Sequence, residues 1–210
     1  MIEVEYLGHS CFRIKAPEGR FVTDPFFEDI GYEMPKVRAD YVTISHGHYD
    51  HCNAMAVDAE EVFADAYEFL DGAVVGKTCY HDDKQGTLRG ENIMFRFTLD
   101  GKTLCHMGDV GEPLNPELLE FLRGTDILLI PVGGIYTITA DQAKEYVDAI
   151  QPKLVIPMHY DDSESNIRLD PVEDFMRLFN HECVSFAEGK YEIEDLPEGE
   201  PHLVILKRRD

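Results

Sequence analysis

Three histidines and an aspartate lie within six positions, at His46, His48, Asp50 and His51, directly after the apolar run 41-YVTI-44. Neither helix nor strand periodicity places all four on one face, but a turn leaving a buried strand can gather them around one point. Without a cation, such crowding would leave polar groups unpaired at a cost in free energy. Imidazole and carboxylate are ligands for Zn²⁺, Mn²⁺ and Fe²⁺, so the segment predicts a metal site rather than a solvated polar loop.

The first half of the chain shows short strand patterns joined by tight turns. Apolar and polar residues alternate over 2–7 and 11–15, and a turn at 17–19 precedes a further strand pattern over 20–26. The run 41–44 is typical of a strand buried on both faces. These segments predict an antiparallel meander that leads into a buried strand.

In the second half, helix and strand patterns alternate. Asp100-Gly101 is a hairpin signal between strands over 93–99 and 103–107. Helices are predicted over 116–124, after the cap Asn115-Pro116, over 140–150, after a capping box of Thr139 and Gln142, and from Asp170-Pro171 to about 180. Further strands are predicted over 126–132, 153–158, 183–187 and 203–207. The pattern predicts an α/β fold as a single domain over residues 1–210 and suggests packed sheets with helices outside, an αββα sandwich, although the pattern alone does not establish four layers.

Composition excludes several classes of partner. The 210 residues include 41 acidic and 19 basic side chains, a formal charge of −22, which repels nucleic acid and anionic membranes. The five cysteines form no C-x-x-C pair, which favours a reducing compartment and argues against a thiolate zinc site. No signal-peptide pattern and no membrane-length apolar run is visible, so a cytoplasmic location is expected.

The pattern His46-x-His48-x-Asp50-His51 resembles the H-x-H-x-D-H signature of the metallo-β-lactamase superfamily. The resemblance implies two adjacent metal ions at the edge of an αββα sandwich, with further ligands at the ends of later strands. Asp109, in 106-HMGDVG-111, matches the family's Gly-Asp motif, whose aspartate bridges both metals. His159, in 157-PMHY-160, matches the terminal histidine.

Two histidines compete for the remaining position. His81 lies in 80-YHDDK-84, followed by Arg89-Gly90-x-Asn92, a run that resembles a small branch of the superfamily with proteins similar to ascorbate-6-phosphate lactonase. His106 lies within a predicted strand, three residues before Asp109, where a supporting role near the ligands or a place in the core is more natural. His81 is favoured because ligating groups concentrate on loops.

The resemblance therefore implies His46, His48 and His81 on one metal, and Asp50, His51 and His159 on the other, with Asp109 shared. Three ligands and a shared carboxylate leave each metal an open coordination position, as catalytic sites require. Asp50 and Asp109 are the expected catalytic carboxylates, with Asp50 orienting the nucleophile or taking its proton.

Other polar residues are expected near the metals as substrate contacts or as supports for the ligands. Asp24 could orient a ligating histidine, or belong to an Asp-Pro turn. His9 could line the pocket, or be a core histidine. Asp82 flanks His81, and Tyr136 and Thr137 lie on a glycine-containing loop that could hold a substrate or simply lead into the next helix.

These observations favour a metal-dependent hydrolase with two divalent cations, Zn²⁺ first and Mn²⁺ or Fe²⁺ as alternatives, in which a hydroxide bridging the metals attacks a lactone or phosphodiester. A small-molecule substrate is expected, and homo-oligomer formation is left open. The alternatives are a degenerate metal-binding module without turnover and a di-iron redox protein. Flavodiiron relatives carry glutamate where this chain has His48, which argues against the redox function.

Overall fold

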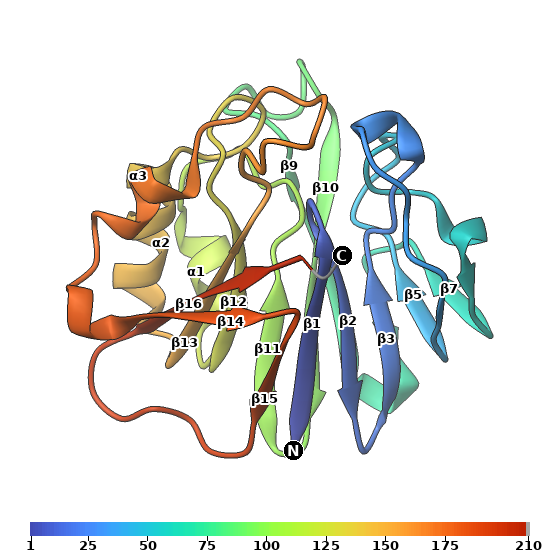
Figure 1. Cartoon of the computed structure of the whole chain (residues 1–210), viewed down its shortest axis with the longest axis horizontal. Coiled ribbons are helices and arrows are strands. Elements are labelled where there is room, and N and C mark those ends of the chain that lie inside the picture. Colours follow the sequence, from blue (N-terminus) through green and yellow to red (C-terminus); the bar gives the residue numbers. More distant parts are fainter. Residues whose placement is uncertain (209–210) are drawn as a thin grey trace.

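Two β-sheets pack face to face in the computed structural model, which describes residues 1–208 (Figure 1). The smaller sheet has the strand order β15-β1-β2-β3-β5-β7. Its strands are β1 (Ile2–Gly8), β2 (Cys11–Ala16), β3 (Gly19–Thr23), β5 (Tyr41–Thr43), β7 (Glu61–Phe63) and β15 (Lys190–Ile193). The first three strands form the predicted antiparallel meander, and β3, β5 and β7 then run parallel.

The larger sheet has the order β14-β16-β13-β12-β11-β10-β9-β8. Its strands are β8 (Glu68–Phe69), β9 (Val74–Tyr80), β10 (Glu91–Leu99), β11 (Lys102–His106), β12 (Ile127–Pro131), β13 (Leu154–Met158), β14 (Val184–Glu188) and β16 (His202–Lys207). Strands β8 to β11 are antiparallel neighbours, whereas β11, β12, β13, β16 and β14 are parallel. A separate parallel pair joins β4 (Val37–Arg38) to β6 (Val57–Asp58).

The parallel strands are connected through three α-helices that cover the outer face of the larger sheet: α1 (Pro116–Leu122), α2 (Ala140–Ile150) and α3 (Val172–Met176) (Figure 1). Strand β12 shows why this sheet needs apolar residues on both faces. Ile127 and Leu129 pack between the sheets, while Leu128 and Ile130 pack under the helices. This double burial accounts for the unbroken apolar run of the sequence.

A third apolar cluster covers the outer face of the smaller sheet. Val22 and Val42 of the sheet pack there against Phe26 and Ile30, and against Ile167 from a distant loop. The covering layer on this side is built from loops and the short 3-10 turn Glu28–Ile30, and within residues 1–208 all the α-helices lie on the other side. The predicted α/β sandwich of two packed sheets is confirmed.

Local sequence signals place several elements correctly. Helix α2 has the predicted bounds and both hydrogen bonds of the Thr139–Gln142 capping box. The Asn115 side chain accepts hydrogen bonds from the first turn of α1, as an N-cap does. Asp100 and Gly101 have φ of 48° and 71°, the left-handed values of a tight hairpin turn.

Two predicted elements end earlier than expected, and the strands β4, β6, β7, β8, β9 and β15 were not predicted. Helix α3 ends at Met176 rather than near 180, and its N-cap is Pro171 without a side-chain hydrogen bond, so Asp170 does not cap it. Strand β3 ends at Thr23, because Asp24 turns the chain with φ of 40° and Pro25 has no amide proton to donate. Strand β9 was missed, since lysine, threonine and glycine interrupt its apolar pattern.

Among residues 1–208, no helix has both the length and the apolar character that crossing a membrane requires.

Candidate metal centre

Side chains that can bind metal converge from loops at the ends of five strands. Asp24 follows β3, the segment His46–His51 follows β5, His81 follows β9, Asp109 lies just beyond β11, and His159 follows β13. The ends of parallel strands meet at one edge of a sheet, and the two sheets pack together, so loops distant in sequence reach a common point. His9 joins them from the turn between β1 and β2.

Asp109 lies at the middle of this group. Its Oδ2 atom is 3.1 Å from His159 Nε2, 3.2 Å from His51 Nε2, 3.4 Å from His81 Nε2 and 3.9 Å from His46 Nε2. The Nε2 atoms of His46, His51 and His159 and the Oδ1 atom of Asp109 are buried and have no hydrogen-bond partner in the described part of the chain. Buried polar atoms without partners are costly, and a cation among them would satisfy them together.

Besides Asp24 with His46 and His51, the candidate ligand atoms form two groups, and each group includes residues close to Asp109 Oδ2. In one, a nitrogen of each of His46, His48 and His81 lies within 4.8 Å of the others. In the second, atoms of Asp50, His51 and His159 lie within the same limit, together with His9. Both groups offer imidazole nitrogen, and the second adds carboxylate oxygen, so the donor set fits divalent cations of borderline hardness.

Buried Asp24 sets the orientation of two of these rings. Its Oδ1 accepts the Ser45 amide at 2.8 Å, and its Oδ2 accepts the Ser45 hydroxyl at 2.6 Å and faces His51 Nδ1 at 2.8 Å. The Ser45 oxygen lies 2.9 Å from His46 Nδ1. Because Ser45 gives its only proton to Asp24, the His46 Nδ1–H donates to Ser45. His46 therefore presents an unprotonated Nε2 toward Asp109, and His51, whose Nδ1 faces Asp24, has Nε2 as the nitrogen that a cation can use.

His9 supports the opposite side of the centre. Its Nε2 lies 3.1 Å from Asp50 Oδ2, its ring centroid lies 4.4 Å from that of His159, and its carbonyl accepts the His159 amide at 2.9 Å. Burial lowers the pKa of His9 to about 4, so the neutral ring donates to Asp50. His9, Asp24 and His159 have φ of 54°, 40° and 52°, a left-handed conformation that non-glycine residues adopt at a cost and that often occurs at functional sites.

Asp109 is itself held by Asn92 and Gly108. The Asn92 Oδ1 accepts the Asp109 amide at 2.8 Å, and its Nδ2 donates to the Met107 carbonyl at 2.9 Å. Gly108 has φ of 53°, and a Cβ there would lie 2.3 Å from Asn92 Oδ1 and 2.6 Å from Ser45 Cβ. Only glycine fits this turn, which aims the carboxylate inward.

The charges of the centre are strongly coupled. Burial alone raises the pKa of Asp109, but the neighbouring His159 and His51 outweigh it and lower this pKa well below its ordinary value. Burial alone lowers the pKa of His51, but Asp109, Asp24 and Asp50 outweigh it and raise this pKa well above its ordinary value. Burial lowers the pKa of His46 to about 3. In the absence of a cation, the proton on His51 therefore compensates the carboxylates.

The structure separates the two competing histidines. The His81 ring lies 4.7 Å from His46 and 5.1 Å from His48, between centroids. His106 uses both nitrogens on the backbone, with Nε2 donating to the Ser10 carbonyl at 2.8 Å and Nδ1 accepting the Gly108 amide at 3.2 Å. His106 thus lies in the core beneath the site, and the geometry favours His81 as the ligand.

The remaining predicted residues divide between the pocket and its supports. Asp82 does not face a substrate, because its carboxylate accepts the amides of Lys84, Gly86, Leu88 and Arg89 at 2.7–2.9 Å and so orders the loop after His81. Tyr136 lines the pocket, whereas the buried Thr137 hydroxyl donates to the Ile138 carbonyl at 3.3 Å, and Thr137 is not part of the pocket lining.

A pocket of about 500 Å³ opens over the metal centre. Its wall includes Tyr49, Arg89, Asn166 and Arg168, which sequence reasoning did not assign to a substrate site. Ser45 and Asn92 were also missed as supports. Ser45 is adjacent to the first histidine, and Asn92 lies in the run that follows His81, so their positions held a signal. Arg168 had none, because it reaches the pocket from a loop far along the chain.

Comparisons with known proteins agree on one family. Residues 3–159 match the family described as "Beta-lactamase superfamily domain". A UPF0173 metal-dependent hydrolase of Nanoarchaeum equitans is 31% identical over 203 residues, covering 82% of this chain and 89% of that protein. A UPF0173 metal-dependent hydrolase of Pelotomaculum thermopropionicum is 31% identical over 208 residues, covering 82% and 90%.

One solved structure is similar over nearly the whole chain. It is the crystal structure of a protein of the metallo-beta-lactamase superfamily from Thermotoga maritima. The two proteins are 34% identical, with a TM-score of 0.81 over 98% of each chain. The predicted fold class, a sandwich of the metallo-β-lactamase type, is confirmed by this likeness.

Proposed function

This chain belongs to the beta-lactamase superfamily, and we propose that it is a metal-dependent hydrolase. In this proposal it uses two divalent cations to cleave an ester-type bond, in a lactone or a phosphodiester. One observation carries the proposal. Nε2 atoms from both groups of histidines lie within 3.9 Å of Asp109 Oδ2, and those of His46, His51 and His159 have no hydrogen-bond partner among residues 1–208. A carboxylate in that position can be shared by two cations.

The proposed ligands follow the two groups. His46, His48 and His81 would hold one cation, Asp50, His51 and His159 would hold the other, and Asp109 would be available to both. Zn²⁺ is the first choice and Mn²⁺ or Fe²⁺ the alternatives, since sites of mixed nitrogen and oxygen donors accept each. When bound, such cations supply hydroxide near neutral pH and polarise the carbonyl or phosphoryl group.

Asp50 is the residue best placed to act on the attacking water. Burial raises its pKa, but hydrogen bonds from His51 and His9 outweigh this effect and keep the carboxylate ionised. Asp50 lines the pocket and is fixed from behind by His9. It can therefore accept a hydrogen bond from the water and orient its lone pair toward the scissile bond.

The size of the pocket favours a small-molecule substrate. A volume of about 500 Å³ lies within the range of pockets that hold metabolite-sized ligands. The charge of −22 argues against nucleic acid, and five free cysteines are consistent with a reducing, cytoplasmic environment. We treat residues 1–210 as one domain, because strands from both halves of the chain share the core between the sheets.

Metal analysis of the protein, coupled to hydrolysis assays, tests this function. Wild type reconstituted with Zn²⁺ or Mn²⁺ should hold about two equivalents and hydrolyse lactones or phosphodiesters, whereas Asp109→Ala should lose both cations and activity. Asp83→Ala, an exposed acid next to the His81 loop, is the matched control and should behave as wild type. Wild type without bound metal would contradict the proposal. Two equivalents without turnover on any ester would favour the non-catalytic alternative.

A further inference from the structure

Two arginines in the wall of the pocket, Arg89 and Arg168, form no ion pair with an acidic side chain of residues 1–208. Thirteen of the 18 lysines and arginines in residues 1–208 form ion pairs, as expected in a chain with 41 acidic residues. Arg89 and Arg168 are among the five that do not, and both line the pocket over the metal centre. Unpaired cations in so acidic a protein suggest that an anion from outside completes them.

Arg89 is positioned by the loop that carries His81. Its amide donates to Asp82 Oδ2 at 2.8 Å, so the carboxylate that orders the loop also fixes the backbone of Arg89. The Arg89 guanidinium lies 5.6 Å from the centre of the Tyr136 ring, and its Nη2 donates to the Ile135 carbonyl at 3.5 Å. These contacts hold the charge at the pocket without neutralising it.

Arg168 approaches from a separate loop. Its neighbours Ile167 and Leu169 are buried in the apolar cluster on the outer face of the smaller sheet, which anchors the backbone on both sides. The Arg168 side chain is exposed and lines the pocket together with Asn166. Two arginines therefore line one pocket from loops almost 80 residues apart in sequence.

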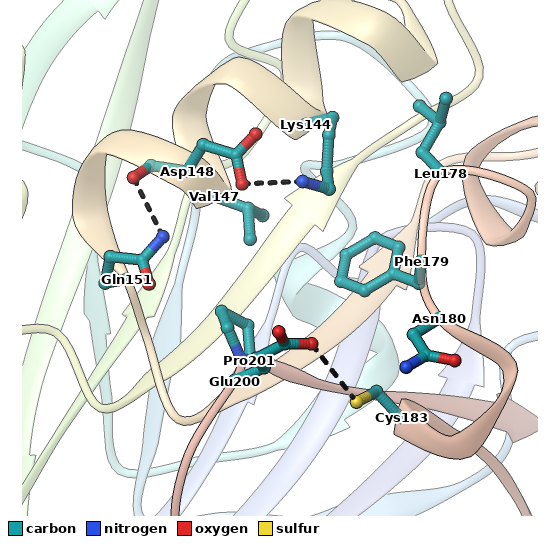
Figure 2. A pocket seen from close by; sticks show the side chains of 10 residues that line it. All are labelled: Lys144, Val147, Asp148, Gln151, Leu178, Phe179, Asn180, Cys183, Glu200 and Pro201. Atoms are coloured by element: carbon teal, nitrogen blue, oxygen red, sulfur yellow. Dashed lines mark hydrogen bonds and ion pairs between the residues drawn. The ribbon is translucent and has the colours of Figure 1, made fainter.

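A second pocket contains a lysine that is already paired with an aspartate. It lies between α2 and the segment before β16 and has a volume of about 250 Å³ (Figure 2). There the Lys144 ammonium donates to Asp148 at 2.5 Å and lies 5.5 Å from the centre of the Phe179 ring, and the Cys183 thiol faces Glu200 at 3.9 Å. Because its one cation is occupied, this pocket points to no ligand.

We propose that the substrate carries an anionic group, a phosphate monoester or a carboxylate, which Arg89 and Arg168 bind while the ester-type bond lies at the metal centre. The placement of the ester-type bond at the metal centre rests on the proposed hydrolase function. The planar guanidinium offers paired donors that match both anions. A protein of charge −22 repels anions at long range, so binding one requires such a local concentration of positive charge.

Three ligands that differ in one group test the inference by calorimetry on zinc-loaded protein: glycerol 3-phosphate, glycerate and glycerol. Wild type should bind at least one of the two anions and not glycerol, and the better of the two identifies the anion. Arg89→Gln and Arg168→Gln should each weaken that binding roughly ten-fold or more, the range for a charge-assisted contact, with unchanged metal content. Arg123→Gln, whose partner is the exposed Glu120, makes the same change in charge away from the pocket and should bind as wild type.

Other outcomes would overturn the inference. One is that the double variant Arg89→Gln/Arg168→Gln binds the anions as tightly as wild type does. Another is that wild type binds glycerol as tightly as the anions, and a third is that it binds none of the three ligands. A failure of the proposed function is distinguishable, because it would appear as absent metal or absent hydrolysis in wild type while arginine-dependent anion binding remained. With an active enzyme, the arginine variants should raise KM for a phosphorylated lactone and leave its unphosphorylated counterpart unchanged.

Discussion

At the scale of single residues, the centre depends on which nitrogen of each histidine carries a proton. Asp24 controls this for two rings, one directly and one through the Ser45 hydroxyl. It touches neither the pocket nor Asp109, so its effect on metal binding is exerted through His46 and His51. A buried carboxylate in this place converts two flexible imidazoles into fixed donors.

Replacing Asp24 by asparagine should therefore weaken metal binding while preserving the shape of the residue. The amide cannot accept from Ser45 and His51 as the carboxylate does, so both rings lose their fixed protonation state. The expected loss in Zn²⁺ affinity is roughly 10- to 100-fold, measured by competition with a chromophoric chelator. Asp126→Asn, which alters a carboxylate that accepts the Thr103 amide away from the centre, should leave the affinity unchanged. Equal losses in both variants would contradict the role of Asp24.

Proton competition at His51 gives metal binding a definite pH dependence. The raised pKa of His51 means that the metal-free protein holds a proton that a cation must displace. Zn²⁺ affinity should thus fall as pH falls, by about ten-fold per pH unit for one displaced proton, below that raised value. In the metal-free protein the sign is opposite, because charged His51 stabilises the fold at low pH and this contribution is lost as pH rises through the raised pKa. Calorimetry in buffers of different ionisation enthalpy counts the protons, and a count of zero would contradict the prediction.

At the scale of elements, each proposed ligand is placed by the turn that ends its strand. The turn after β11 shows the tightest constraint, because Gly108 lies against Asn92 and Ser45 with no room for a side chain. Asn92 comes from β10 and Ser45 from the end of β5, so this turn is also a point at which the two sheets meet. Its conformation decides where the Asp109 carboxylate points.

Gly108→Ala should destabilise the protein and displace Asp109. The left-handed backbone alone costs roughly 1–3 kcal/mol for a residue with a Cβ, and the clash with Asn92 adds to it. Gly101→Ala is the matched control, since Gly101 has φ of 71° but no atom within 4 Å of a built Cβ. Urea unfolding of the metal-free variants should show a larger loss for Gly108, together with a lower metal content. Equal losses at both positions would indicate that the backbone angle alone matters.

At the scale of the whole molecule, the proposed ligands come from both sheets. His46 to His51 follow a strand of the smaller sheet, whereas His81, Asp109 and His159 follow strands of the larger one. Cations bound among them would link the two sheets, in addition to the apolar core that the sheets share. Metal binding and the stability of the complete fold should therefore be linked.

Removal of metal should lower the thermal stability of the whole chain. A ligand present at a thousand times its Kd stabilises the native state by about 4 kcal/mol, and a chelator removes this contribution. Calorimetry should show a single transition that moves to lower Tm with chelator and returns when Zn²⁺ is restored. Asp109→Asn should show a smaller shift or none. A wild-type Tm independent of chelator would contradict the link.

Local sequence signals were sufficient to predict the candidate ligand types and several of the elements. The capping box of α2, the cap of α1, the Asp100-Gly101 hairpin and the motif from His46 to His51 all depend on neighbours a few residues away, and such signals can be recognised in one dimension. The superfamily followed from the same motif. Strand β9 was missed for the converse reason, because its stability comes from pairing with β8 and β10 rather than from its own pattern.

How these parts meet depends on long-range packing and could not be predicted from the local signals. The tertiary structure placed His81 beside Asp109 and turned His106 into the core, it directed the Asp82 carboxylate to its own loop, and it brought Arg168 to the pocket. These outcomes depend on the order of strands in two sheets and on where each crossover connection returns, which no short segment encodes. Local motifs therefore supply the residue types of the site, whereas its geometry and the residues around its pocket depend on packing.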